Sequence, residues 1–457
     1  MQYDAIIIGS GQAGNPLWDS LTDRGWTVAL IEHAHLGGTC NNTGCTPTKT
    51  LVASAQIAHY ARNAARWGVH ADGVSVDLPR IVARKDAVVR QFRVGKESLA
   101  ASRKTLHLHR GHARFVSPTT VAVGEAVMEG KRIFINTGTR PAVPRIDGLD
   151  QVDYLTNASL LELQVLPDHL LVLGGGYIGL EFAQIFRRFG SRVTLVHKDA
   201  LILNREDEDV AGELRKALEA EGIRFVLDAK TTRVAQENGR VTLSLERPTG
   251  PETLSGTHLL LAAGRRPNTD RLDLDKAGVE TDQRGYVKVN GRLETNVPGI
   301  WALGDVKGGP AFTHISYDDY QIVYGNLLEG KNLNIEGRLV PYAVFTDPQL
   351  GRVGMTEKEA TRATGRKLKV GKIPVTWVAR ALERDETAGL MKLVVDAATD
   401  QILGAAILAT EGGELVHILQ TLMLARAPYT LLKGSIYIHP TLAEGFFSLM
   451  EDVKPIE

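Results

Sequence analysis

The sequence predicts an α/β protein in which one strand–turn–helix–strand unit occurs twice. An apolar strand at residues 3–8 and another at residues 170–173 each lead into a glycine-rich turn. A helical pattern and a second strand follow, at residues 28–31 in the first unit and 193–196 in the second. The turn glycines of the second unit lie 165 positions after those of the first, and the two sets are Gly9, Gly11 and Gly14, and Gly174, Gly176 and Gly179. Strands that alternate with helices in this way are typical of parallel sheets.

The two turns have the chemistry of dinucleotide binding. Glycines let the backbone approach a pyrophosphate at a helix N-terminus, and a carboxylate about 20 residues later accepts a ribose hydroxyl. Glu32 is this carboxylate in the first unit. The second unit has His197 and Lys198 at that place, and their positive charge would favour the 2′-phosphate of NADPH over NADH. The alternative is that the pair is a solvated basic loop tip.

The chain contains only two cysteines, Cys40 and Cys45, just after the first strand pair. Residues five apart point in different directions on a regular helix, so a disulfide here needs a distorted loop that enters a helix. Pro47 suits the first turn of that helix, and a helix N-terminus favours a thiolate. Two buried structural cysteines are the alternative. The neighbouring nucleotide unit favours a redox-active pair.

Composition limits the classes of function. The 457 residues suggest two to four domains, and 43% of them are apolar, enough for large cores. A formal net charge of +0 gives no argument for a nucleic-acid partner. The apolar runs are far shorter than the ~20 residues that span a bilayer, and the chain opens directly into a strand without a signal-like segment. We therefore expect a cytoplasmic protein with no membrane partner.

Three further strand ends complete the pattern. An apolar strand ends in Gly304-Asp305, where the carboxylate can bind a sugar-alcohol chain or serve as a surface turn residue. Strand–glycine elements at residues 133–138 and 259–264 close the two units.

Together these motifs resemble the flavin-dependent pyridine nucleotide–disulfide oxidoreductases, which include lipoamide dehydrogenase, glutathione reductase and mercuric reductase. The resemblance covers essentially the whole chain. Its motifs are the first glycine turn with Glu32, the stretch from Gly38-Thr39-Cys40 to Cys45-x-Pro47-x-Lys49, the second glycine turn with Glu181, Gly304-Asp305, and the C-terminal stretch from His439-Pro440 to Glu444.

The resemblance implies an α/β fold with two Rossmann-like dinucleotide-binding domains, for FAD and NAD(P), and a C-terminal α+β dimerisation domain. The FAD domain would occupy residues 1–150 and be completed by a central segment at 271–336. The NAD(P)H domain would occupy residues 151–270. Residues 337–457 would form the two-fold interface of a homodimer. Prolines and glycines near residues 141–148, 267 and 337–341 agree with these boundaries.

The resemblance also implies roles for single residues. Cys45 faces the flavin as the charge-transfer thiolate, and Cys40 is the interchange thiol that meets the substrate. Lys49, paired with Glu181, stabilises negative charge on the reduced flavin. The expected contacts of FAD and the nicotinamide cofactor are Gly9, Gly11, Gly14, Glu32, Gly38, Thr39, Lys49, Ala113, Thr137, Gly138, Gly304, Asp305 and Thr313, and Gly174, Gly176, Gly179, His197, Lys198 and Gly264. No resident metal site is expected.

The C-terminal stretch has two interpretations. Residues 441–444 read as a capping box, with Thr441 as the N-cap of a helix and Glu444 at its third position. The resemblance instead makes His439, supplied by the opposite subunit, the acid–base for Cys40, with Glu444 orienting its ring. Both interpretations can hold at once.

The substrate is the least determined part. Residues 201–207, 346–349 and 354–357 look like the mercuric-reductase branch, but the chain lacks that branch's additional cysteine pairs and retains His439. The preferred hypothesis is an NADPH-dependent reductase of a disulfide or a soft metal ion, close to the reactive-chlorine-resistance branch. Lipoamide dehydrogenase, the shared subunit of a multienzyme complex, is the alternative, although His197 in place of an acidic residue counts against it because that complex uses NAD. A non-catalytic flavoprotein that serves as a binding module is the third and most remote hypothesis.

Overall fold

The computed structural model describes residues 1–365 and 367–456. Its first region is a five-stranded parallel sheet of order β19-β8-β2-β3-β4. The strands are β2 (Ala5–Ile8), β3 (Val28–Glu32), β4 (Leu106–Arg110), β8 (Ile133–Ile135) and β19 (Ile300–Ala302). Every residue of β2 and β3 is buried, as expected for parallel strands with both faces covered.

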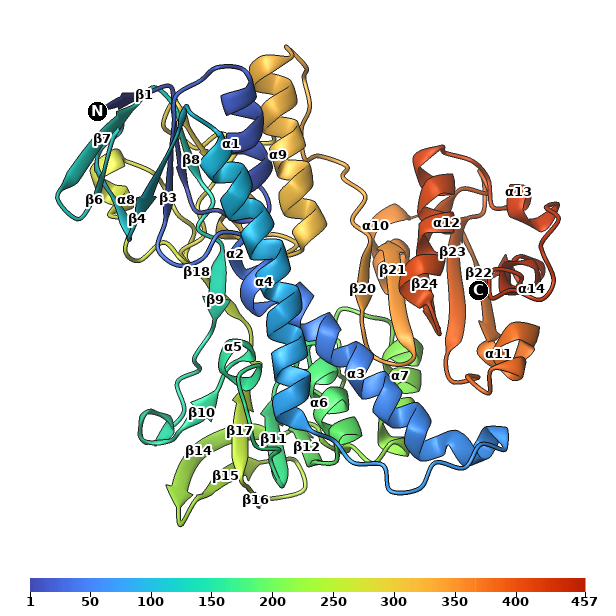
Figure 1. Ribbon diagram of the computed structural model, residues 1–457. Helices are drawn as coiled ribbons and strands as arrows, with labels where there is room; N and C mark the ends of the chain where they lie inside the picture. Colours follow the sequence, from blue (N-terminus) through green and yellow to red (C-terminus); the bar gives the residue numbers. More distant parts are fainter. Residues whose placement is uncertain (366, 457) are drawn as a thin grey trace.

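Helices from both ends of the sequence cover this sheet. The helices are α1 (Gly14–Asp23), α4 (Leu78–Ser102) and α9 (Thr313–Leu328), and Figure 1 shows α1 and α9 side by side although they are far apart in sequence. A smaller sheet of order β1-β7-β6-β5 lies beside them and contains β1 (Gln2–Tyr3), β5 (Ala113–Ser117), β6 (Thr120–Val123) and β7 (Ala126–Gly130).

The first predicted strand is in fact two strands. Residues 3–8 are interrupted at Asp4, and the chain passes from β1 in the smaller sheet to β2 in the parallel sheet. Asp4 accepts hydrogen bonds from the Thr27 backbone N–H and hydroxyl at 3.0 and 2.9 Å. The side chain therefore ties the crossing point to the neighbouring strand, a contact that hydrophobic periodicity does not report.

The second strand–turn–helix–strand unit forms another five-stranded parallel sheet, of order β10-β17-β11-β12-β13. Its strands are β10 (Tyr154–Leu155), β11 (His169–Leu173), β12 (Arg192–Val196), β13 (Arg224–Val226) and β17 (His258–Leu261), with helices α5 (Asn157–Leu160), α6 (Tyr177–Phe189) and α7 (Glu208–Ala220). An antiparallel sheet adjoins it, formed by β14 (Lys230–Glu237), β15 (Arg240–Glu246) and β16 (Glu252–Gly256). Strands β9 (Thr139–Pro141) and β18 (Arg265–Pro267) pair where the chain enters and leaves the unit.

The C-terminal region is a six-stranded antiparallel sheet with helices, drawn orange to red in Figure 1. Its strands, in the order of the sheet, are β20 (Tyr342–Val344), β21 (Gln349–Gly354), β24 (Ile402–Ala409), β23 (Leu390–Asp396), β22 (Leu368–Pro374) and β25 (Lys454–Pro455). Its helices are α10 (Glu357–Thr364), α11 (Ala379–Glu383), α12 (Gly412–Leu424), α13 (Thr430–Lys433) and α14 (Gly445–Glu451).

The apolar run at residues 415–424 forms α12, and its side chains divide between two roles. Leu415, Leu419 and Leu422 are buried in the core of their own region, whereas Leu424 is 67% exposed. Among the described residues, no helix is both long and apolar enough to cross a membrane.

Candidate active site

A cavity of about 1500 Å³ lies where the three regions meet. Its wall contains many of the residues expected to bind FAD or carry the redox chemistry, namely Gly9, Gly11, Glu32, Gly38, Thr39, Cys40, Cys45, Lys49, Ala113, Thr137, Gly138, Glu181, Asp305 and Thr313. The described chain thus brings together residues that lie up to three hundred positions apart in sequence. Residues of the C-terminal region, among them Leu339, Tyr342 and His417, close one side of the cavity.

The first glycine turn fits closely against the end of β8. A Cβ atom on Gly9 would lie 2.4 Å from the carbonyl oxygen of Asn136, and one on Gly14 would lie 2.3 Å from the carbonyl oxygen of Gly9. Gly9 also has φ +101°, which a side chain disfavours. Asn136 donates a hydrogen bond from Nδ2 to the Gly9 carbonyl at 3.1 Å, a role that the sequence patterns missed.

Glu32 is buried at the end of β3 and holds the same turn. Its Oε2 accepts hydrogen bonds from the backbone N–H and the hydroxyl of Ser10 at 3.0 and 2.9 Å, and its Oε1 accepts from the Ala34 N–H at 2.9 Å. The carboxylate is therefore fixed by the turn itself at the wall of the cavity.

The residues present fit a bound dinucleotide. The Thr137 hydroxyl is buried at the cavity wall and has no hydrogen-bond partner among the described residues. The glycines of the turn have no side chains, so a ligand can approach their backbone closely. Asp305 accepts a hydrogen bond from the Thr139 hydroxyl at 2.9 Å, which fixes its carboxylate at the same wall. An unpaired polar atom beside a glycine cradle is what a polar ligand satisfies on binding.

A helix break brings the two cysteines together. Cys40 lies on α2 (Gly38–Thr43) and Cys45 begins α3 (Cys45–Asn63), with Gly44 between the two helices. A Cβ on Gly44 would lie 2.8 Å from the Thr39 carbonyl oxygen and 3.2 Å from the Cys40 Cα, so glycine permits the sharp turn. The sequence predicted a distorted loop here, and the distortion is confined to this one residue. Both thiols are free in the structure.

The two thiols differ in acidity. The hydrogen bond from Cys40 lowers the pKa of Cys45 to about 6, and the Thr313 hydroxyl and the charge of Lys49 act in the same direction against burial. The hydroxyl lies 3.2 Å from the Cys45 sulfur. The same Cys40–Cys45 hydrogen bond, together with burial, raises the pKa of Cys40. These opposite shifts favour a thiolate on Cys45 and a protonated thiol on Cys40.

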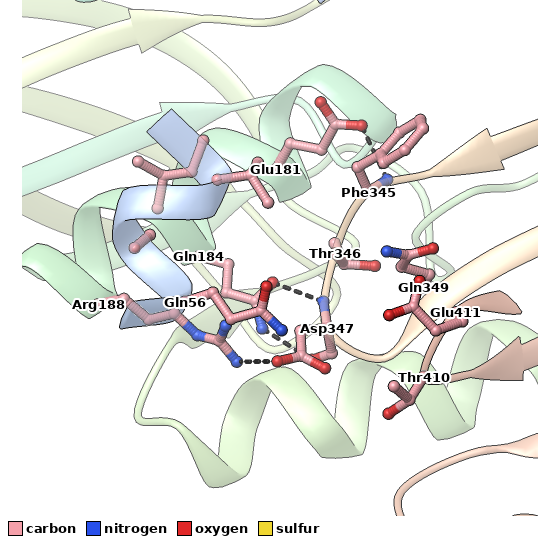
Figure 2. A pocket seen from close by; sticks show the side chains of 13 residues that line it. Gln56, Glu181, Gln184, Arg188, Phe345, Thr346, Asp347, Gln349, Thr410 and Glu411 are labelled. Atoms are coloured by element: carbon pink, nitrogen blue, oxygen red, sulfur yellow. Dashed lines mark hydrogen bonds and ion pairs between the residues drawn. The ribbon is translucent and has the colours of Figure 1, made fainter. Parts of the chain in front are cut away.

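Lys49 and Glu181 form the ion pair that the sequence predicted. The Lys49 Nζ lies 2.7 Å from Glu181 Oε2 and 4.5 Å from the centre of the Phe345 ring. Glu181 Oε1 accepts a hydrogen bond from the Phe345 backbone N–H at 2.9 Å, shown as a dashed line in Figure 2. Phe345 was not identified from the sequence, although it directly precedes the stretch at residues 346–349, because nothing in the local pattern places that segment beside Lys49.

Glu181 and Phe345 also form part of the wall of a second, smaller cavity of about 160 Å³. In Figure 2 the side chains of Gln184 and Arg188, both on α6, point toward Asp347. Gln184 exchanges hydrogen bonds with the Asp347 backbone at 2.8 Å, and Arg188 pairs with its carboxylate at 2.8 Å. These contacts fix the segment that carries Phe345 against α6.

The predicted capping box at residues 441–444 is wrong. Helix α14 begins at Gly445, and the Thr441 hydroxyl donates to the Ile438 carbonyl at 2.9 Å instead of capping a helix. The Glu444 carboxylate lies 2.9 and 3.0 Å from Nδ1 of His439 and is thus committed to the imidazole. The other ring nitrogen, Nε2, is left as the basic one. His439 and Glu444 lie outside the wall of the large cavity of their own chain.

The second glycine turn, between β11 and α6, repeats the first. A Cβ on Gly174 would lie 2.4 Å from the Ala262 carbonyl oxygen, and one on Gly179 would lie 2.1 Å from the Gly174 carbonyl oxygen. His197 Nδ1 accepts a hydrogen bond from the Gly175 N–H at 3.1 Å, and burial lowers the pKa of His197. Asp199, whose Oδ2 lies 3.4 Å from Nε2 of His197, acts against this shift, and Lys198 is the exposed cation of the predicted pair.

Comparison with known proteins agrees with this geometry. The family described as "Pyridine nucleotide-disulphide oxidoreductase" matches residues 3–319, and its dimerisation domain matches residues 340–449. The chain belongs to this family. It is an FAD-dependent oxidoreductase that uses a pyridine nucleotide, as the sequence predicted.

Three relatives are similar over nearly the whole chain. The probable pyridine nucleotide-disulfide oxidoreductase RclA of Escherichia coli is 39% identical and covers 99% of this chain and 100% of its own. Its solved Cu(II) complex has a TM-score of 0.90 at 38% identity over 98% of this chain and 100% of that one. A mercuric reductase of Streptomyces lividans is 37% identical over 91% of this chain and 88% of its own. A dihydrolipoyl dehydrogenase of Thermus scotoductus is 36% identical over 98% of this chain and 97% of its own.

Proposed function

We propose that this protein is a homodimeric, cytoplasmic NADPH-dependent reductase that delivers electrons through Cys40 and Cys45 to a small disulfide or a soft metal ion. The observation that carries the proposal is the pair of free thiols of opposite acidity beside the Lys49–Glu181 ion pair, in the wall of a cavity built by a dinucleotide turn. The similarity to a protein solved as a Cu(II) complex supports a copper ion as the metal substrate.

In this proposal the domains are those expected from the sequence: residues 1–150 with 271–336 for FAD, 151–270 for the nicotinamide cofactor and 337–457 for the dimer. Gly9, Gly11, Gly14, Glu32, Thr137 and Asp305 would hold FAD. Bound FAD supplies two-electron transfer from the nicotinamide to the cysteine pair. Lys49 places a positive charge at the same cavity wall and stabilises negative charge that develops there.

The thiol chemistry follows from the two acidities. Cys40, whose pKa is raised, loses its proton to Nε2 of His439 of the partner subunit and attacks a sulfur of the substrate disulfide. The substrate S–S bond breaks, and the first leaving thiol takes the proton back from the imidazolium. The Cys45 thiolate then attacks the Cys40 sulfur, which closes the Cys40–Cys45 disulfide. The second substrate sulfur leaves as a thiolate that is protonated by solvent, so two electrons have passed to the substrate.

The NADPH preference rests on Lys198 in this proposal. Burial lowers the pKa of His197, so its ring attracts the 2′-phosphate only weakly, and Asp199 Oδ2 lies 3.4 Å from its Nε2. Position 197 itself carries no carboxylate that would repel the phosphate. The exposed Lys198 ammonium follows directly in sequence and is free to meet the phosphate at the loop tip.

A second function, oxidation of a dihydrolipoyl group, is favoured by one observation. The His439–Glu444 pair is intact, and a dithiol substrate needs a base that removes its protons. Turnover of the purified holoenzyme with NADPH or NADH against oxidised glutathione, lipoamide, mercuric ion and cupric ion separates the candidates. Reduction of at least one disulfide or metal ion with NADPH supports the main proposal. Activity confined to lipoamide with NADH would replace it with the second.

A further inference from the structure

Three aromatic rings form a parallel stack in the wall of the large cavity beside Cys45. Phe312 lies in the middle, with its ring centre 5.4 Å from that of His314 and 5.3 Å from that of Tyr342, and both pairs have an interplanar angle of 10°. Tyr177 packs against Phe312 at 6.0 Å. All four rings line the cavity and none is fully buried, so the stack is more than core filling.

Hydrogen bonds anchor both ends of the stack. At one end, the Tyr342 hydroxyl donates to the carboxylate of Glu206, which forms an ion pair with Arg352 at 2.7 Å. Glu206 is 6% exposed and Arg352 is 3% exposed, so this anchor is shielded from water. At the other end, Nε2 of His314 donates to the Pro341 carbonyl at 2.7 Å.

The anchors come from separate parts of the sequence. Glu206 precedes α7 in the second parallel-sheet region, Tyr342 begins β20 of the C-terminal region, and Phe312 precedes α9 of the first region. The stack therefore exists only when all three regions are assembled.

The middle ring determines where Thr313 lies. Thr313 is the first residue of α9, and its two sequence neighbours, Phe312 and His314, are both members of the stack. Its hydroxyl lies 3.2 Å from the Cys45 sulfur. Rotation of the first turn of α9 would separate the hydroxyl from the sulfur, and such a rotation would have to break the stack.

We propose that Phe312 and Tyr342 are positioning residues that hold the Thr313 hydroxyl against the Cys45 thiolate. The inference rests on the proposed function of Cys45. The Glu206–Arg352 pair fixes Tyr342, Tyr342 fixes Phe312, and Phe312 fixes the first turn of α9. The acidity of the thiol beside the flavin site is thereby linked to the assembly of the three regions. The lowered pKa of Cys45, to which Thr313 contributes, agrees with this arrangement.

The test is the acidity of Cys45 in the reduced holoenzyme of four variants. Phe312→Leu removes the stacking ring, whereas Phe312→Tyr keeps an aromatic ring at this position. Tyr342→Phe keeps the ring and removes the anchor. Tyr317→Phe is the matched control, because it removes a hydroxyl from an exposed ring of the same helix outside the cavity wall. The readouts are the pH dependence of the long-wavelength thiolate–flavin absorbance and of Cys45 alkylation, followed by peptide mass spectrometry.

The expected shift in the pH midpoint of Cys45 ionisation follows from the loss of one hydrogen bond, from the Thr313 hydroxyl to the charged thiolate. We expect Phe312→Leu to raise the midpoint by about one pH unit, a roughly tenfold loss of thiolate below the midpoint. Tyr342→Phe should raise it by a smaller amount, while Phe312→Tyr and Tyr317→Phe keep the wild-type midpoint.

A wild-type midpoint in FAD-loaded Tyr342→Phe, or in FAD-loaded Phe312→Leu, overturns the inference. If Phe312→Leu does not fold, Tyr342→Phe decides alone. The proposed function fails on different results: no thiolate absorbance in the wild-type enzyme on two-electron reduction, or turnover confined to lipoamide with NADH.

Discussion

Replacing Lys49 with methionine should change both the stability of the protein and the acidity of Cys45. The ammonium lies 2.7 Å from Glu181. At an effective dielectric constant of about 20, a pair at this distance has a Coulomb energy of about 6 kcal/mol, most of which offsets desolvation. The side chain of Glu181 is 3% exposed and that of Lys49 is 31% exposed, so water screens one partner only.

Lys49→Met leaves the buried Glu181 carboxylate with the Phe345 N–H as its one remaining hydrogen-bond partner within residues 1–365 and 367–456. Breaking a buried pair costs about 3–5 kcal/mol, and the partial exposure of Lys49 places the expected loss near the lower end, about 3 kcal/mol. Thermal unfolding of the holoenzymes of Lys49→Met, Glu181→Gln and the double variant measures it. The double variant should lose less than the sum of the single variants, because the two residues act as a pair.

The acidity of Cys45 gives the sharper result, since the two charges act in opposite directions. The Lys49 charge lowers the pKa of Cys45 and the Glu181 charge raises it. Because the folded thiol has its pKa lowered to about 6, its alkylation rises as pH increases through that value. Lys49→Met should move the midpoint upward by about one unit, and Glu181→Gln should move it downward. Shifts of the same sign in both variants, or additive losses of stability, would refute the paired arrangement.

Three other predictions concern the thiols, the cofactor and the dimer. Two-electron reduction should produce a long-wavelength thiolate–flavin band that Cys45→Ser abolishes, whereas Cys40→Ser shows it without reductant; a band in Cys45→Ser would remove this residue from the flavin site. Lys198→Ala should weaken NADPH affinity by roughly 10–100-fold, because a charge-assisted contact is lost, and combining it with His197→Glu should reverse the preference to NADH. Equal use of NADH and NADPH by the wild type would show that Lys198 is only a solvated loop tip. Mixing inactive Cys40→Ser and His439→Ala subunits should restore disulfide reduction toward half, and no recovery after proven subunit exchange would argue against a shared site.

The sequence predicted what local patterns encode. The two glycine turns, Glu32 at the end of β3 and the helix break between Cys40 and Cys45 all follow from spacing within a few dozen residues. The family assignment and the α/β fold are confirmed by the comparisons. The helical start expected at Thr441 is wrong because Glu444 contacts the imidazole of His439, five residues earlier, instead of completing a cap.

What the sequence could not predict depends on contacts between distant segments. Phe345 meets Lys49 and Glu181 only after the C-terminal region has docked on α6. The lowered pKa of His197 depends on the burial of its ring, which the residue type alone does not reveal. Tyr177 lies within the second glycine turn, between Gly176 and Gly179, and an aromatic residue at that place was a usable signal for the cavity wall.

The strand order of the first parallel sheet has a consequence for synthesis on the ribosome. Strand β8 pairs on its outer edge with β19, so that Ile133 meets Ile300. Until residue 300 emerges, the nascent sheet has an open edge of unpaired backbone groups, a template for intermolecular pairing. At elongation rates of about 5–20 residues per second this interval lasts about 10–30 s. The second parallel-sheet region is translated entirely within this interval. Once β19 has paired with β8, the ring of Trp301 stacks on that of Phe134 with their centres 5.1 Å apart.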